Sequence, residues 1–335
     1  MTSNNECSDS AIGLDVGTSR IVAAKRAKQG FQFDEQLNAF VTIPFSKITE
    51  SVLRQQNVPH VASDSQIVVH GNESERLADF LHVETRRPMD KGFLNPLEPD
   101  GLDRISHLIR TTCGNPTQEE QLVYFSVPAA PIGGEDTLTY HESTLRQVLS
   151  DLGYRAKSIT EGLAVVYAEL EDSNYTGIGI SCGGGLCNVC LAYLSVPVFA
   201  FSIPKAGDFI DASSASVTGD LATSVRLTKE QSFQFNGHFT DKTHQALAVY
   251  YDDMIRSLVE ALKDRLSSCR SLSKLSRPVP LVLSGGSSLP GGFRDRFEMV
   301  VRESEFPTSL SDIRMADSPI HSTAKGALVA ALIDV

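Results

Sequence analysis

The sequence predicts a two-lobed α/β protein in which each lobe is a mixed sheet flanked by helices. The chain has 335 residues, a length that suggests two domains or one large two-lobed unit. Residues 12–24 (IGLDVGTSRIVAA) and 178–192 (IGISCGGGLCNVCLA) repeat one pattern about half a chain apart. Strand and helix patterns alternate in the remainder of the chain, as they do in α/β folds.

Each repeated segment is predicted to be a β-hairpin. An apolar strand leads into a glycine-containing turn, and a second strand of small and β-branched residues follows. Asp15 of the first segment and Ser181 of the second occupy equivalent positions. The repeat therefore suggests two similar half-chains that each open with a hairpin.

Apolar periodicity predicts the other elements in chain order. We expect buried strands over residues 121–128 and 280–283, and helices over residues 73–81, 140–152, 162–170, 251–266 and 323–332. The expected organisation is a disordered tail over residues 1–10, a first lobe over 11–160 with an inserted subdomain at about 31–87, and a second lobe over 161–335 with a small inserted subdomain at about 211–244.

Composition narrows the class of protein. Apolar residues make up 41% and charged residues 21% of the chain, which excludes a mainly disordered protein. No apolar run approaches the ~20 residues of a membrane helix, and the polar start is unlike a signal peptide. The net charge of −11 disfavours direct binding to nucleic acid or to a membrane. Six cysteines without a secretion signal fit a cytoplasmic location.

The turn of the first hairpin is a candidate phosphate site. Gly17 lets the backbone approach an anion closely, and Thr18 and Ser19 add hydroxyl and amide donors. Asp15 stands at the end of a strand, where one carboxylate suits a hydrated Mg²⁺. The alternative is an ordinary hairpin turn with a capping aspartate.

Two further glycine clusters suggest the same chemistry. Gly183, Gly184 and Gly185 permit a nest of amides that faces a phosphate; the alternative is a flexible turn. Residues 284–288 (SGGSS) follow a strand, a common place for the sugar and base of a nucleotide. Neither cluster matches the lysine-containing phosphate loop or the dinucleotide fingerprint.

These segments, in this order and spacing, resemble the nucleotide-binding segments of the actin-like ATPase superfamily, which includes actin, chaperone ATPases, sugar kinases and the MreB-type bacterial actins. Three further stretches resemble MreB most closely. They are residues 87–92 (RPMDKG), residues 126–128 (SVP) with 159–164 (ITEGLA), and residues 206–208 (AGD) with Asp211.

The resemblance implies an actin-like (ribonuclease H-like) fold with ATP and Mg²⁺ in a cleft between the lobes. Asp15 would hold Mg²⁺ through water, and Glu161 would orient or activate the attacking water. The implied nucleotide-binding residues are Gly17, Thr18 and Ser19 at the β- and γ-phosphates, Gly183, Gly184 and Gly185 in the second phosphate hairpin, Gly207 and Asp208 near the phosphates, Glu230 on the adenine side, and Gly285, Gly286 and Ser287 at the adenosine.

The sequence departs from the superfamily pattern in the second hairpin. Ser181 stands where an aspartate is usual, Leu186 replaces a threonine, and Asn188 replaces a second aspartate. Loss of a carboxylate weakens the outer shell of the metal. The adenine side also lacks the lysine expected one turn after Glu230, and the segment after Asp208 is short for an MreB-type protein. These departures favour nucleotide binding over efficient hydrolysis.

Two residue patterns have competing interpretations. Cys182, Cys187 and Cys190 have a spacing that a zinc site could use, but a hairpin of small buried residues explains them better. Glu161 could simply cap the helix that follows it.

Our leading hypothesis is a bacterial actin-like, MreB-related ATP–Mg²⁺-binding protein with a cytoskeletal or scaffold role, weak hydrolysis and possible self-assembly into filaments. The alternatives are a non-polymerising chaperone-like or adaptor pseudo-ATPase that acts on a protein partner, and a small-molecule kinase of the same fold.

Overall fold

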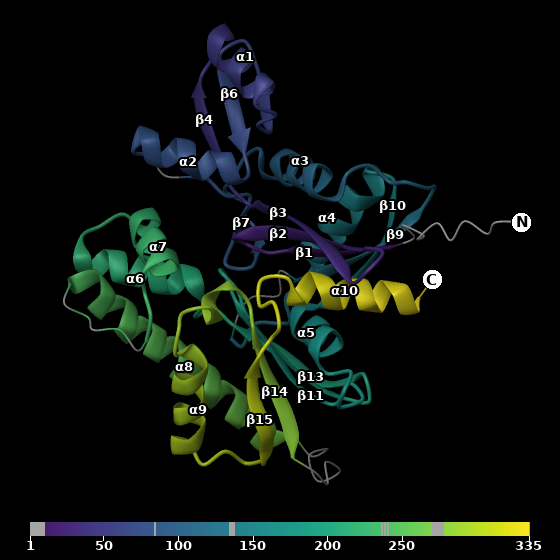
Figure 1. The fold of residues 1–335 in the computed structure, drawn as a ribbon, viewed down its shortest axis with the longest axis vertical. Helices are drawn as coiled ribbons and strands as arrows, with labels where there is room; N and C mark the ends of the chain where they lie inside the picture. Colours follow the sequence, from purple (N-terminus) through teal and green to yellow (C-terminus); the bar gives the residue numbers. More distant parts are fainter. Residues whose placement is uncertain are drawn as a thin grey trace, which may run out of the picture.

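We analysed a computed structural model of the chain, which describes residues 11–83, 85–133, 138–235, 237, 239, 241–269 and 278–334. The predicted N-terminal tail, residues 1–10, lies outside this part. Two five-stranded sheets dominate the structure, one in each lobe (Figure 1). The predicted two-lobed α/β architecture is therefore confirmed.

The two sheets share one topology. Each has three antiparallel strands in succession, followed by two strands that join in parallel beside the first one. The first sheet has the order β10-β9-β1-β2-β3 and consists of β1 (Ala11–Val16), β2 (Arg20–Arg26), β3 (Phe31–Leu37), β9 (Gln121–Val127) and β10 (Tyr154–Thr160). The second has the order β13-β12-β11-β14-β15 and consists of β11 (Gly177–Cys182), β12 (Cys187–Tyr193), β13 (Val196–Ile203), β14 (Val279–Ser284) and β15 (Leu310–Met315).

Two helices lie between the sheets, α5 (Glu161–Glu169) and α10 (Ser322–Ile333). The elements approach so closely that only glycine fits at their crossings. A Cβ on Gly13 of β1 would lie 2.1 Å from the Ala324 carbonyl oxygen of α10, and one on Gly326 would lie 1.7 Å from the Ala164 carbonyl oxygen of α5. The last helix of the chain thus packs against the first strand.

Strand alternation decides which side chains face this inter-sheet layer. Ile12, Leu14 and Val16 face the outer core of the first lobe, so Asp15 shares the inner face with Gly13. Ile178, Ile180 and Cys182 likewise face the outer core of the second lobe, which places Ser181 on its inner face. The repeated hairpins thereby direct two equivalent positions toward the region between the lobes.

Further helices cover the outer faces. Helices α3 (Gly101–Cys113) and α4 (Leu138–Asp151) pack on the first sheet, and α8 (Lys242–Ser268) and α9 (Phe293–Glu303) pack on the second. The core of the second lobe is built around Tyr251, which stacks on Phe233 with a ring-centroid distance of 5.1 Å.

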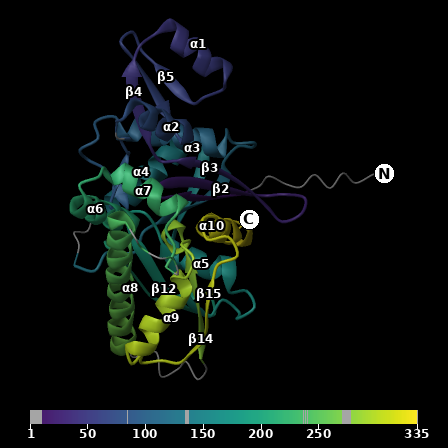
Figure 2. The ribbon, with the colours of Figure 1, turned by 60° about the vertical axis from the view of Figure 1, so that its left-hand side comes forward.

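A separate three-stranded sheet extends from the first lobe (Figure 2). It consists of β4 (Phe40–Pro44), β5 (His60–Ala62) and β6 (Gln66–His70), with the helices α1 (Lys47–Gln55) and α2 (Asn72–Leu81) beside it and the short strands β7 (Met89–Asp90) and β8 (Phe93–Leu94) after it. The insertion was predicted to start at residue 31, but β3 belongs to the main sheet. Its polar residues fit an edge strand, where both faces are only partly buried.

The predicted small insertion at 211–244 has more regular structure than its polar sequence suggested. Its start lies inside α6 (Gly207–Thr218), and it contains α7 (Ala222–Gln231) and the first residues of α8. Among the described helices, none is both long and apolar enough to cross a membrane.

Candidate functional site

All residues predicted for the site line one cavity of about 430 Å³ between the two lobes. They are Asp15, Gly17, Thr18, Ser19, Glu161, Gly183, Gly184, Gly185, Gly207, Asp208, Glu230, Gly285, Gly286 and Ser287. This volume lies within the usual range for small-molecule sites, about 300–1,000 Å³. The topology brings both hairpins and the turn after β14 to the same end of the cleft.

The first hairpin closes with a tight turn. The Gly17 N–H donates to the Arg20 carbonyl at 2.9 Å, and the Asn38 amide donates to the Gly17 carbonyl at 2.9 Å. The Thr18 hydroxyl is buried and accepts a hydrogen bond from the Gly92 N–H at 3.0 Å. The stretch 87–92 that resembled MreB therefore supports the candidate phosphate turn directly.

The second hairpin is held by two other predicted segments. The Gly183 carbonyl accepts hydrogen bonds from the Gly207 N–H at 3.1 Å and from the Ser287 hydroxyl at 2.8 Å. The Gly184 carbonyl accepts one from the Asp208 N–H at 2.8 Å. The amides of Gly207 and Asp208 are thus engaged within the protein, and their contribution is to position the hairpin.

Glycine in the second hairpin also has a packing reason that the sequence did not show. A Cβ on Gly184 would lie 2.1 Å from the Ser19 hydroxyl oxygen, and one on Gly185 would lie 2.2 Å from the Gly92 nitrogen. Both contacts are to the first lobe. The tip of the second hairpin therefore touches the first hairpin, and glycine allows this close approach.

Two carboxyl groups approach one another in the cleft. Asp15 accepts a hydrogen bond from the Ser126 hydroxyl at 2.6 Å, and Glu161 accepts one from the Ser181 hydroxyl at 2.9 Å. Burial raises the pKa of Asp15 to about 6. Burial, together with the negative charge of Asp15, raises the pKa of Glu161 to about 8. The region accordingly favours a proton or a cation.

These groups fit a Mg²⁺ ion that keeps most of its ligands from outside the protein. Mg²⁺ usually binds through one or two carboxylates together with water and substrate phosphates. Asp15 and Glu161 supply that number of carboxylates, and burial raises the pKa of both, so a bound cation would stabilise their ionised forms. Within the described residues, no group of three or more His, Cys, Asp or Glu side chains forms a complete metal site.

Four charged residues of the cavity wall were not predicted as site residues: Arg20, Asp211, Arg226 and Lys229. Lys229 is buried, and its ammonium group donates to the Asp211 carboxylate at 2.8 Å. Arg226, one turn earlier on α7, is also buried and forms an ion pair with Glu75 of the other lobe. Arg226 and Lys229 are three residues apart, a spacing that places them on one face of a helix. This signal was overlooked because the segment looked like an unpatterned insertion.

Ion pairs join the lobes across the cleft. Besides Arg226 and Glu75, Arg87 binds the Asp208 carboxylate at 2.8 Å, and Arg20 lies 3.9 Å from Glu230. The predicted adenine-side residue Glu230 thus faces a cation of the first lobe. The cleft is closed by contacts between residues of opposite charge.

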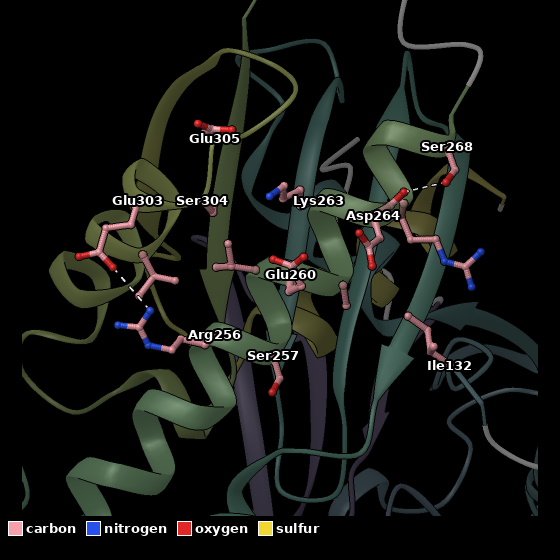
Figure 3. Close-up of a pocket in the computed structure, with 14 residues that line it drawn as sticks. Ile132, Arg256, Ser257, Glu260, Lys263, Asp264, Ser268, Glu303, Ser304 and Glu305 are labelled. Atoms are coloured by element: carbon pink, nitrogen blue, oxygen red, sulfur yellow. Dashed lines mark hydrogen bonds and ion pairs between the residues drawn. The ribbon is translucent and has the colours of Figure 1, made fainter.

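A second hollow lies on the surface of the second lobe between α8 and α9 (Figure 3). It has a volume of about 1030 Å³ and contains none of the predicted site residues. Its side chains carry both signs of charge, and Arg256 lies 3.5 Å from Glu303. These features are typical of a solvated surface, whereas the interlobe cavity contains converging polar groups.

Comparison with known proteins agrees with this architecture. A family model described as Volactin matches residues 10–331. A search of curated proteins gave no match.

Solved structures provide the second comparison. The fold is similar to that of a MamK double helical filament subunit, with a TM-score of 0.73 and 18% identity over 96% of this chain and 98% of that one. It is also similar to MreB 5 of Spiroplasma citri bound to AMPPNP, with a TM-score of 0.67 and 12% identity over 94% of both chains. The protein EutJ of Carboxydothermus hydrogenoformans follows with a TM-score of 0.54 and 14% identity over 95% of this chain and 88% of that one. The actin-like fold predicted from the motifs is confirmed.

Proposed function

The chain belongs to the Volactin family, and we propose that it is an actin-like cytoskeletal or scaffold protein whose lobes close on ATP and Mg²⁺. One observation carries the proposal: both hairpins and the turn after β14 line a single cavity between two sheets of the same topology. A ligand in this cavity contacts both lobes at once. Its binding energy can therefore be coupled to the angle between them.

The phosphates would lie at the two hairpin turns, where Thr18 and Ser19 supply donors beside the glycines of the second hairpin. Asp15 and Glu161 would hold Mg²⁺ through water, and the ion would neutralise phosphate charge. Gly285, Gly286 and Ser287 would contact the adenosine. In support, two similar folds, a MamK mutant and MreB 5 of Spiroplasma citri, were solved with AMPPNP.

Hydrolysis should be weak for a reason specific to this chain. A general base must be deprotonated at the working pH. The pKa of Glu161 is raised to about 8 by burial and by Asp15, so most Glu161 side chains carry a proton at neutral pH when no cation is present. Ser181 adds no negative charge with which to recruit that cation. Glu161 is then a poor acceptor for a proton from water.

Self-assembly into filaments in the cytoplasm is the proposed setting, since the MamK structure is a filament. One observation favours the alternative of a non-polymerising adaptor. Ser181 stands where the superfamily pattern has an aspartate; it donates a hydrogen bond to Glu161 at 2.9 Å but supplies no carboxylate for a metal ion. Sedimentation with and without Mg-ATP separates the two, because only a filament former pellets in response to nucleotide.

Calorimetric titration with Mg-ATP tests the site itself. We expect saturable binding that weakens in Asp15→Asn and is unchanged in Asp34→Asn, a surface variant on β3 whose carboxylate pairs with Lys25 at 3.4 Å. Absence of binding by the wild-type protein at millimolar nucleotide would contradict the proposal. Equal affinity of Asp15→Asn and wild type would show that the metal lies elsewhere.

A further inference from the structure

The second hairpin carries two thiols side by side, directly before and after its glycine turn. Cys182 is the last residue of β11 and Cys187 the first of β12, and the two are partners in the strand register. Both are free thiols and fully buried. We propose that Cys182 and Cys187 form a redox-active pair that oxidises to a cross-strand disulfide at the base of the glycine turn. This proposal does not depend on which ligand the cleft binds.

The register gives the pair the backbone geometry of a disulfide. The Gly183 N–H donates to the Leu186 carbonyl at 3.0 Å, so the next rung, Cys182 with Cys187, is a non-hydrogen-bonded pair. A Cβ on Gly285 would lie 2.3 Å from the Cys182 carbonyl oxygen, which shows that this carbonyl faces β14 and not β12. In such pairs the Cα atoms are about 4.5 Å apart, within the range of about 4.4–6.8 Å found in disulfides.

The third cysteine of the run cannot take part. Cys182 and Cys187 belong to the same outer core cluster of the second lobe, because paired residues point to one face. Cys190 lies three residues after Cys187 and therefore points to the opposite face, where its Cβ would be 2.9 Å from a Cβ on Gly162. The zinc interpretation of the run needs all three sulfurs together, so the structure does not support it.

The chemistry requires a two-electron oxidant, and the proposal takes hydrogen peroxide as that oxidant. The Cys187 thiol donates a hydrogen bond to the Lys205 carbonyl at 3.3 Å, so the Cys182 sulfur is the first nucleophile. It attacks peroxide, breaks the O–O bond and becomes a sulfenic acid with release of water. The Cys187 sulfur then displaces the second oxygen as water. Two thiols and one peroxide thus give one disulfide and two waters.

The position of the pair links oxidation to the cleft. The contact with Cys182 and burial hold the pKa of Cys187 well above its usual range, so the second step, attack by the Cys187 sulfur, should be slow. Disulfide formation removes the hydrogen bond from Cys187 to Lys205, which lies just before the Gly207 and Asp208 amides that hold the glycine turn. The oxidised hairpin would therefore be cross-linked at its base and less firmly attached to α6.

Peptide mapping of the full-length protein tests the proposal. The chain is treated with hydrogen peroxide, denatured, alkylated with N-ethylmaleimide and digested with trypsin. Residues 158–205 form one tryptic peptide that contains all three cysteines of the run. We expect this peptide to lose two hydrogen atoms and to carry a single alkyl group, on Cys190. Cys269 is partly exposed and shows, in a separate peptide, that the oxidant acted.

Variants identify the partners. Cys190→Ser should still form the disulfide, whereas Cys182→Ser and Cys187→Ser should each abolish the two-hydrogen loss. The proposal is overturned if wild-type protein keeps all three thiols alkylatable while Cys269 is oxidised, or if the bond maps to Cys190. The wild-type result alone decides the matter if a serine variant does not fold.

Discussion

At the scale of the residue, charge in the cleft is unbalanced. Asp15 and Glu161 lie close enough for the negative charge of one to raise the pKa of the other, and each has a serine hydroxyl as its hydrogen-bond donor. A carboxyl group whose pKa is higher in the folded than in the unfolded chain binds its proton more tightly in the folded state. Its ionisation therefore destabilises the fold as the pH rises.

The raised pKa values of these carboxyl groups predict that the free energy of unfolding falls as the pH rises. Glu161→Gln should remove this fall. Asp15 contributes to the pH dependence of stability only up to about pH 6, because it is ionised above that pH. Glu161 continues to titrate up to about pH 8. The wild-type free energy of unfolding should fall between pH 6 and pH 8, by a few kcal/mol at most since one pKa unit corresponds to about 1.4 kcal/mol. Urea unfolding with a chelator present measures it. A variant that loses stability as steeply as the wild type would contradict the assignment.

Ser181 gives a second test at this scale. Ser181→Asp adds a carboxylate beside Glu161, so Mg²⁺ affinity and ATP turnover should increase, on the order of tenfold by analogy with other outer-shell ligands. Steady-state phosphate release at several Mg²⁺ concentrations measures the change. Ser181→Asn is the matched control because it has a similar shape without the charge. Equal turnover in both variants would place the catalytic centre elsewhere.

Single residues also show what the sequence could reveal. Asp15 and Ser181 each lie two residues before the first glycine of the turn in their own hairpin, so local pattern and spacing were sufficient to select them. Arg226 and Lys229 were missed because they lie in a polar segment that looked like an unpatterned insertion, and because the partner of Arg226 is distant in the chain. Glu75 lies 151 residues from Arg226, and an ion pair of that separation leaves no local signal.

At the scale of the element, the helices between the sheets depend on small residues. The crossing of α5 and α10 leaves no room at Gly326, whose added Cβ would meet the Ala164 carbonyl oxygen at 1.7 Å. The small-residue helix and both hairpins were predictable from periodicity. The edge strand β3 and the helix α7 were not, because polar residues on a half-exposed element resemble a loop.

Gly326→Ala should accordingly destabilise the protein, by roughly 1–3 kcal/mol or more, since overpacking forces the two helices apart. Gly101→Ala in α3 is the control, because its Cβ would meet Glu98 at an ordinary 3.5 Å. Alanine has a higher helix propensity than glycine and restricts the unfolded chain, so this variant should be as stable as the wild type or slightly more stable. Thermal unfolding measures both, and equal melting temperatures would contradict the packing argument.

At the scale of the whole molecule, the lobes are held together by ion pairs that cross the cleft. The pair of Arg226 and Glu75 is the most buried of those between the lobes, with side-chain exposures of 7% and 18%. Removing one partner of a buried pair costs about 3–5 kcal/mol because the other charge stays unpaired. The angle between the lobes should therefore respond to this contact.

Glu75→Gln should open the ligand-free molecule, which small-angle scattering would detect as a larger radius of gyration. Glu73→Gln on the same helix is the control, since Glu73 pairs with Arg76 of its own helix at 3.4 Å and such exposed pairs contribute about 0–1 kcal/mol. If both variants scatter like the wild type, the ion pairs across the cleft do not set the lobe angle.

The return of α10 to the first sheet has a consequence for synthesis on the ribosome. The strands of the first sheet emerge early, but the face formed by Ala11, Val22 and Leu122 is covered by Ala324, Leu328 and Ala331 of α10, which are synthesised about 200 residues after Leu122. Until then that apolar face lacks the α10 residues that cover it. The first lobe must wait for α10 to be translated before its fold is complete, and in that interval it presents a surface that nascent-chain chaperones would bind.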